Sequence, residues 1–147
     1  GAIVTAWDLE PIEEYHAIIK QPQEYIDRMD DWNKQHHGES GLVAQIPNGK
    51  EPAVVEGELM RLVKKHFSGD PAILAGNSIS QDKLFIAKYL PNLNALLHYR
   101  MMDVTAWKIV MQAKFNAKFD KKNPHRAVDD IKESIAEFKY YLSFLKT

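Results

Sequence analysis

The chain has 147 residues, a formal net charge of −1 and no cysteine, and its 45% hydrophobic and 27% charged residues are average proportions for a globular protein. Disorder, a disulfide scaffold, thiol catalysis and zinc–thiolate sites are therefore excluded, no apolar run is long enough to cross a membrane, and the length fits one domain over residues 1–147. The near-zero charge also argues against a broad surface for long duplex nucleic acid, so a nucleic acid ligand must be short or held locally.

The first half of the chain predicts a β-hairpin followed by two helices. Short runs rich in Ile, Val, Tyr and Trp span residues 2–7 and 12–19, and the turn-forming residues 8–11 separate them. Apolar residues spaced by three and four predict one helix over residues 22–38. The same period recurs over residues 54–67, where a second helix is expected.

The second half of the chain alternates strands with helices. The apolar runs 72–75 and 99–104 predict strands, the first of them buried. Helical patterns cover residues 84–89, 106–115 and 127–145. The resulting order (strand, strand, helix, helix, strand, helix, strand, helix, helix) predicts an α/β sheet covered by helices.

Two segments place carboxylates where proteins of this class bind ligands. Asp82 follows the strand 72–75 at the carboxyl edge of the sheet, which is the ligand-binding edge of open α/β sheets. His125, Asp129 and Asp130 lie at the expected start of the last helix. An Asp pair in a first helical turn is explained equally well by the helix dipole, and a lone histidine is more often structural. These segments alone do not decide between the two explanations.

Five short motifs in one order give the chain a resemblance to the oligoribonuclease family. They are Met29-Asp30-Asp31-Trp32-Asn33, Ser40-Gly41-Leu42, Gly76-Asn77-Ser78-Ile79 with Gln81-Asp82, His98-Tyr99-Arg100 with Asp103-Val104, and His125-Arg126-Ala127-Val128-Asp129-Asp130-Ile131. The likeness extends from about residue 2 to the C-terminus. It implies an α/β fold with a ribonuclease-H-like mixed sheet flanked by helices. It also implies a homodimeric 3′→5′ exoribonuclease that degrades very short single-stranded RNA to mononucleotides.

The resemblance implies a site in which four acidic residues and one histidine hold two divalent ions, Mg²⁺ or Mn²⁺. Two such ions, about 3.5–4 Å apart, clamp a scissile phosphate, and hard cations of this kind prefer carboxylate oxygens. Asp82 and Asp130 are the implied metal ligands, and His125 is the implied catalytic residue that positions and deprotonates the attacking water. Asp130 follows the family's spacing from the histidine. If His125 belonged to the last helix, Asp129 would share its face instead.

The implied RNA-binding residues include Tyr99, Arg100, Ser78 and Thr105. Short single strands are held by stacking on aromatic rings, worth about 1–3 kcal/mol per base, and by contacts to phosphate. The resemblance implies that Tyr99 packs against a base and Arg100 caps the terminal phosphate across the dimer interface. From the residues alone, a core tyrosine and a surface arginine would be preferred.

Trp32 and His37 match two further substrate-binding positions near the site. Trp32 also completes an apolar helix face, so a core role stays open for it.

One motif of the family is not in its expected place. Family members begin with a strand that carries Asp-x-Glu, followed by Met-Thr-Gly-Leu, and those carboxylates complete the metal cage. Here Asp8-Leu9-Glu10 is followed by Pro11-Ile12-Glu13, so we interpret residues 8–10 as the hairpin turn. We therefore expect the first central strand to be absent from this chain, its neighbours to lack ladder partners, and metal binding and hydrolysis to be weak.

Two other functions stay open at this point. The chain could be a non-catalytic dimerising or oligonucleotide-binding fragment, which would form dimers without metal-dependent hydrolysis. It could also be a DNA-directed proofreading relative, which the His-Tyr-Arg motif disfavours. The lack of cysteine and of a visible secretory signal predicts a cytoplasmic protein.

Overall fold

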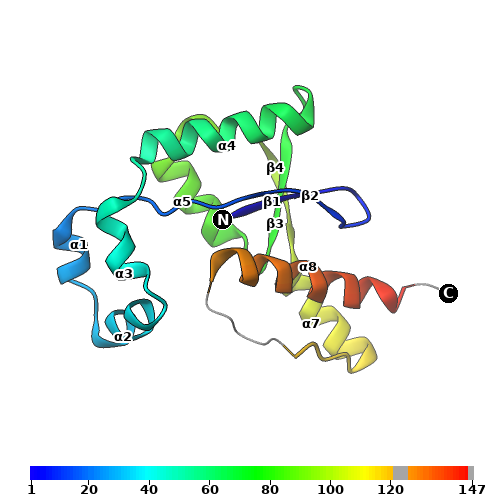
Figure 1. Ribbon diagram of the computed structural model, residues 1–147. Helices are drawn as coiled ribbons and strands as arrows, with labels where there is room; N and C mark the ends of the chain where they lie inside the picture. Colours follow the sequence, from blue (N-terminus) through cyan, green and yellow to red (C-terminus); the bar gives the residue numbers. More distant parts are fainter. Residues whose placement is uncertain (121–125, 146–147) are drawn as a thin grey trace.

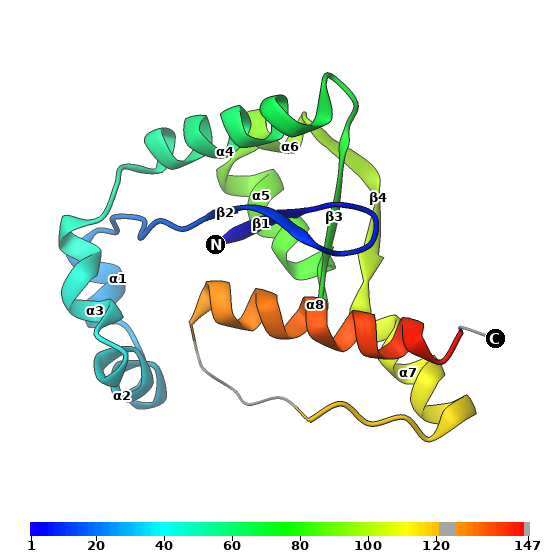
Figure 2. The same ribbon diagram turned by 45° about the vertical axis from the view of Figure 1, so that its right-hand side comes forward.

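The computed structural model describes residues 1–120 and 126–145 and shows an α/β protein (Figure 1). The strands are β1 (Ala2–Thr5), β2 (Pro11–Tyr15), β3 (Ala72–Gly76) and β4 (Leu97–Asp103). The helices are α1 (Gln23–Asp27), α2 (Asp31–Glu39), α3 (Leu42–Gln45), the 3-10 helix η1 (Ile46–Asn48), α4 (Pro52–Phe67), α5 (Ser80–Tyr89), α6 (Pro91–Asn94), α7 (Val104–Phe115) and α8 (Ala127–Ser143). The hairpin β1–β2 lies between α4 and α8 in both views (Figures 1 and 2).

The predicted β-hairpin is confirmed. β1 and β2 pair antiparallel, from Ala2 opposite Tyr15 to Thr5 opposite Pro11. In the turn, Asp8 Oδ1 accepts a hydrogen bond of 3.0 Å from the Glu10 N–H. This is the local side-chain bond by which aspartate favours turns. Residues 8–10 therefore form the hairpin turn, as predicted.

The prediction of one helix over residues 22–38 is wrong, because the segment forms α1 and α2 with a break between them. Asp30 Oδ1 accepts hydrogen bonds from the Asn33 N–H at 2.7 Å and from Asn33 Nδ2 at 3.0 Å. A carboxylate in this position satisfies an otherwise unpaired amide at the start of a helix. The cap starts α2 at Asp31, although the apolar period continues through the break.

The helix α4 matches its predicted span closely. Pro52 stands in its first turn, where the missing N–H of proline costs nothing, and Ser68 ends the helix in a left-handed conformation (φ 47°). Its last turn carries the basic residues Lys64, Lys65 and His66, which complement the negative end of the helix dipole.

The strands form two separate pairs. β3 and β4 run parallel, with Leu74 opposite Met101 and Gly76 opposite Asp103. Among the described residues, no ladder joins this pair to the hairpin, and both views show the hairpin crossing the direction of β3 and β4 (Figure 2). β1 and β3 are thus each paired on one side only, as expected if a central strand is absent. The α8 helix packs against both of them.

The main apolar cluster joins α7 and α8. Its buried members are Val104, Met111, Ala117, Phe138 and Tyr141. Trp107 packs edge-on against Phe138, with 5.6 Å between the ring centres. Burial of each such side chain contributes about 1.5–3 kcal/mol, so this cluster fixes the position of α8. Within the described part of the chain, no helix combines the length and apolar character needed to span a bilayer.

Candidate functional site

The turn after β3 is bonded to the junction of β4 and α7. The Ser78 N–H donates to Asp103 Oδ1 at 3.0 Å and lies 2.9 Å from Thr105 Oγ1, while the two hydroxyl oxygens of Ser78 and Thr105 are 3.3 Å apart. Asp103 Oδ1 also caps α7 by accepting the Thr105 N–H at 2.9 Å. The structure therefore brings together Ser78 and Thr105, two of the predicted substrate-binding residues.

Asp82 lies in the first turn of α5, just beyond Ser78, and its carboxylate is exposed. A Cβ on Gly1 would lie 3.2 to 3.4 Å from side-chain atoms of Ala127, Val128 and Ile131. Gly1 thus adjoins the first turn of α8.

Asp129 and Asp130 lie in that first turn, after an extended N-cap at Arg126. Glu137 lies on α8 seven residues beyond Asp130, which places the two about 20° apart around the helix axis, whereas Asp129 and Glu137 are about 80° apart. Glu137 contacts the turn after β3, because its Oε2 accepts a hydrogen bond of 2.9 Å from Asn77 Nδ2. Asp130 therefore shares the face of α8 that is directed at this turn. The predicted catalytic residue His125 lies outside the described residues.

Tyr99 and Arg100 lie in the middle of β4. Tyr99 is 73% exposed, so the alternative of a core tyrosine is wrong. Its ring stacks on His98 with 4.5 Å between ring centres, and the guanidinium carbon of Arg100 lies 5.1 Å from its centre. Four residues of strand, roughly 13 Å, separate Tyr99 from Asp103. The structure does not bring Tyr99 and Arg100 beside Ser78 within one chain.

Trp32 and His37 lie on α2, which packs against α3 at one side of the molecule (Figure 1). Trp32 is 59% exposed, so its alternative role in the core is also wrong. The His37 carbonyl accepts a hydrogen bond from Ser40 Oγ at 3.1 Å. The structure does not bring either residue together with Asp82 and Ser78.

The tripeptide Asp8-Leu9-Glu10 lies at a different end of α8 from the candidate site. Glu10 Oε1 forms an ion pair of 2.5 Å with Lys139 Nζ. Lys139 follows Asp130 by nine residues, roughly 13 Å along the helix. The tripeptide lies in the hairpin turn, and its exclusion from the site stays a prediction.

The carboxylates at the site are the type of ligand that a divalent cation prefers, but they are too few to hold one. Asp82 and Asp130 offer the hard oxygen ligands that Mg²⁺ and Mn²⁺ prefer. Among the residues that the structure describes, however, no three acidic or histidine side chains cluster closely enough to hold a metal ion. The described residues therefore form at most part of a two-ion cage.

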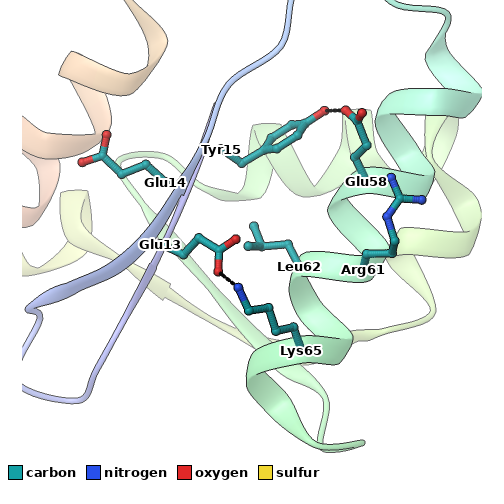
Figure 3. A pocket seen from close by; sticks show the side chains of 7 residues that line it. All are labelled: Glu13, Glu14, Tyr15, Glu58, Arg61, Leu62 and Lys65. Carbon is teal, nitrogen blue, oxygen red and sulfur yellow. Dashed lines mark hydrogen bonds and ion pairs between the residues drawn. The ribbon is translucent and has the colours of Figure 1, made fainter.

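A cavity of about 260 Å³ between β2 and α4 is a second polar region (Figure 3). It is lined by Glu13, Glu14, Tyr15, Glu58, Arg61, Leu62 and Lys65. The Tyr15 hydroxyl donates to Glu58 Oε2 at 2.6 Å, and Glu13 Oε2 is paired with Lys65 Nζ at 2.5 Å. Because its three carboxylates are each paired with a base, this cluster fastens the hairpin to α4 and offers no free carboxylate to a metal.

These pairings shift pKa values in the directions expected for mutual stabilisation. The hydrogen bonds from Lys65 and then His66 lower the pKa of Glu13, and those from Lys50 and Tyr15 lower the pKa of Glu58. Burial, followed by the bond to Glu58, raises the pKa of Tyr15.

One residue at the site, Glu137, was missed by the reasoning from sequence. It is fully buried, and its two carboxylate oxygens accept hydrogen bonds from Asn77 and Tyr141. The available signal was a carboxylate one turn before Tyr141, on the apolar face of the last helix.

Comparisons with known proteins agree with the motifs. The RNase_T exonuclease family matches residues 1–138. A protein named oligoribonuclease from Francisella tularensis subsp. tularensis (strain WY96-3418) is 42% identical over 144 residues, which cover 96% of this chain and 81% of that protein. A protein of the same name from Francisella tularensis subsp. novicida (strain U112) is 41% identical over 144 residues, again covering 96% of this chain and 81% of that protein. One from Arabidopsis thaliana is 39% identical over 150 residues, covering 96% of this chain and 66% of the plant protein.

Proposed function

Because the chain belongs to the oligoribonuclease family and is by that membership a 3′→5′ exoribonuclease, we propose that it degrades very short single-stranded RNA to mononucleotides at the carboxyl end of β3. The observation that carries the proposal is the bonded pair Ser78 and Thr105 at the carboxyl end of β3, directly before the helix turn that holds Asp82. Hydroxyls and carboxylates at this edge suit a phosphodiester and its cations.

Asp82 and Asp130 are the proposed ligands of Mg²⁺ or Mn²⁺, and Asp130 is preferred to Asp129 because it shares the face of Glu137. Two bound ions supply an activated water and stabilise the leaving oxygen in phosphodiester hydrolysis. His125 is the proposed catalytic residue, with the task of positioning the water and accepting its proton. Family members carry the further ligands on an Asp-x-Glu strand, and a strand placed between β1 and β3 would pair with edges that have no ladder partner among the described residues.

Tyr99 and Arg100 are proposed to serve the site of a second copy in a homodimer. Within one chain they lie too far along β4 to reach Ser78, yet their side chains are exposed. Met101 on β4 and Leu84 and Phe85 on α5 are also exposed, by 38%, 65% and 63%. Exposed apolar side chains on neighbouring elements are typical of interfaces between subunits.

Trp32 and His37 are proposed as further substrate contacts. The exposed ring face of Trp32 suits base stacking, although α2 contributes nothing to the site within one chain. The cytoplasm is the proposed compartment, because a chain without cysteine needs no oxidising environment to form disulfides.

A non-catalytic oligonucleotide-binding module is the second candidate function. The observation in its favour is that the described residues include no complete cluster of metal ligands. In that case the chain would bind short RNA and dimerise without hydrolysing it.

The two functions separate in one assay. We would incubate the chain, preceded by a strand containing Asp-Leu-Glu-Met-Thr-Gly, with a 5′-labelled RNA dinucleotide or with the matching DNA dinucleotide, in Mn²⁺ and in EDTA, and measure mononucleotide release. An exoribonuclease releases mononucleotides from RNA only when Mn²⁺ is present. RNA binding without release would favour the binding module, and a preference for DNA would favour a proofreading relative.

A further inference from the structure

Glu137 is an acidic side chain in the apolar interior of the protein. Its exposure is 0%, as is that of Tyr141, one turn later on α8. Asn77 Nδ2 donates to Glu137 Oε2 at 2.9 Å, and the Tyr141 hydroxyl donates to Glu137 Oε1 at 2.8 Å. A buried carboxylate costs several kcal/mol unless hydrogen bonds satisfy it, so packing alone does not favour glutamate here. An apolar residue beside Phe138 would fill the same interior position.

The bond to Asn77 links two segments that are 60 residues apart. Asn77 opens the turn between β3 and α5, and its other amide atom, Oδ1, is buried without a hydrogen-bond partner among the described residues. The fixed end of this side chain is therefore the end that faces Glu137. The turn is held to α8 at this point.

Three consecutive residues of the turn are anchored in three directions. Asn77 is bonded to α8, Ser78 to Asp103 and Thr105, and Ile79 is buried at 6% exposure. Ser78 adopts φ 50°, a left-handed conformation that costs a non-glycine residue roughly 1–2 kcal/mol and persists only where its surroundings hold it. The helix α5 begins immediately afterwards, and Asp82 lies in its first turn.

The other end of the link lies on the helix that carries Asp130. Glu137 and Asp130 are seven residues apart and share one face of α8. The Asn77–Glu137 bond therefore connects the segment before Asp82 directly to the helix face of Asp130.

We propose that Glu137 is a positioning residue for the exonuclease reaction, which through Asn77 holds the turn after β3 against α8 and so keeps Asp82 and Asp130 at the separation that a divalent cation requires. The inference rests on the proposed role of these two aspartates as metal ligands. Glu137 touches neither substrate nor metal, and it acts through Asn77.

The first test follows the turn directly, without metal. Glu137→Ala removes the acceptor of Asn77 and should speed amide hydrogen exchange at Ser78 about tenfold relative to amides in α4, the factor that corresponds to losing one hydrogen bond to a charged group. Glu137→Gln should rescue most of the protection, because a rotated Asn77 amide can accept from the new side-chain NH₂ through its unpaired Oδ1.

Tyr141→Phe is the matched control. It deletes a hydrogen bond to the same carboxylate but leaves the bond to Asn77 in place. This variant should lower the stability to urea, as Glu137→Ala does, while Ser78 exchange relative to α4 stays unchanged. Equal acceleration of Ser78 exchange in both variants would overturn the proposal, because Glu137 would then contribute only to general stability.

The second test measures Mn²⁺ affinity from the paramagnetic broadening of amide signals in the first turn of α5. Glu137→Ala should weaken the affinity about tenfold, as is typical for residues that orient metal ligands, and Tyr141→Phe should not. Asp82→Ala reports on the ligand itself. If Asp82→Ala weakens binding and Glu137→Ala does not, the inference alone is overturned. If Asp82→Ala has no effect, the ligand assignment fails and the inference falls with it.

Discussion

Two polar regions of this protein use carboxylates in opposite ways. Between β2 and α4, Glu13 and Glu58 are paired with Lys65 and Lys50, so their charges hold the hairpin in place (Figure 3). At the carboxyl end of β3, Asp82 and Asp130 form no ion pair with any residue that the structure describes. Each of these two aspartates lies in the first turn of a helix, where the helix dipole favours a carboxylate and leaves it available to a cation. Pairing of charge, more than the presence of a cavity, distinguishes the two regions.

The largest effect is expected from Asp82→Asn. Loss of a metal ligand removes several kcal/mol of transition-state stabilisation. In the version preceded by a strand containing Asp-Leu-Glu-Met-Thr-Gly, Mn²⁺-dependent hydrolysis of an RNA dinucleotide should therefore fall at least about a hundredfold. The urea unfolding midpoint should not fall, because Asp82 holds no structural partner among the described residues. Asp8→Asn, in the hairpin turn, is the control that should keep its activity. An equal loss in both variants would remove the distinction between site and turn.

The next effect concerns Tyr99 and Arg100. Tyr99→Ala should weaken dinucleotide binding by about 1–3 kcal/mol, measured by fluorescence anisotropy, whereas Tyr99→Phe should retain the stacking.

If Tyr99 and Arg100 serve a partner's site, mixing Asp82→Asn protein with Arg100→Ala protein should restore activity. Random exchange gives heterodimers with one intact site, or roughly a quarter of wild-type activity. No recovery after verified subunit exchange would contradict a shared site.

A smaller effect is expected at the paired region. Tyr15→Phe removes the hydroxyl that donates to Glu58 and should lower the free energy of unfolding by about 0.5–1.5 kcal/mol. Activity on the RNA dinucleotide should stay unchanged. Loss of activity without loss of stability would show that the cavity beside β2 takes part in the reaction.

The smallest effect is a pH dependence at Glu13. Lys65 and His66 lower the pKa of Glu13 in the folded state, so its ionised form stabilises the fold above the pKa of an unfolded glutamate, about 4.3. That stabilisation is lost as the pH falls through the lowered pKa of the folded state. Urea unfolding at a series of acidic pH values should therefore show a steeper decline for the wild type than for Glu13→Gln.

The sequence predicted those parts of the fold that depend on local pattern. The strand β3 and the helices α4 and α8 follow from apolar periodicity, because each buries one face. The hairpin follows from turn-forming residues, because the chain reverses its direction there. The break between α1 and α2 was missed because the Asp30 side chain caps a new helix without interrupting the apolar period. The apolar period does not show whether an amide bonds to a helix carbonyl or to a capping side chain, so it does not locate such a break.

The candidate site was predictable where the family motifs carry it and unpredictable where it depends on distant contacts. Ser78 and Thr105 are hydrogen-bonded, and Asp82 follows in the first turn of α5, while their roles in substrate and metal binding stay predictions. The exposure of Tyr99 contradicts the alternative that this tyrosine packs in the core. The role of Glu137 depends on its hydrogen bond with Asn77, which lies 60 residues earlier in the chain. No pattern within α8 predicts that contact.

The central claim is that the carboxyl end of β3, with the first turn of α8, is an exonuclease site completed by a strand that carries Asp-x-Glu. The most direct measurement compares Mn²⁺-dependent hydrolysis of a 5′-labelled RNA dinucleotide by the 147-residue chain and by a version preceded by a strand containing Asp-Leu-Glu-Met-Thr-Gly. The account predicts strong activity in the extended version alone, and its loss on Asp82→Asn. Activity in the 147-residue chain that Asp8→Ala abolishes would contradict it.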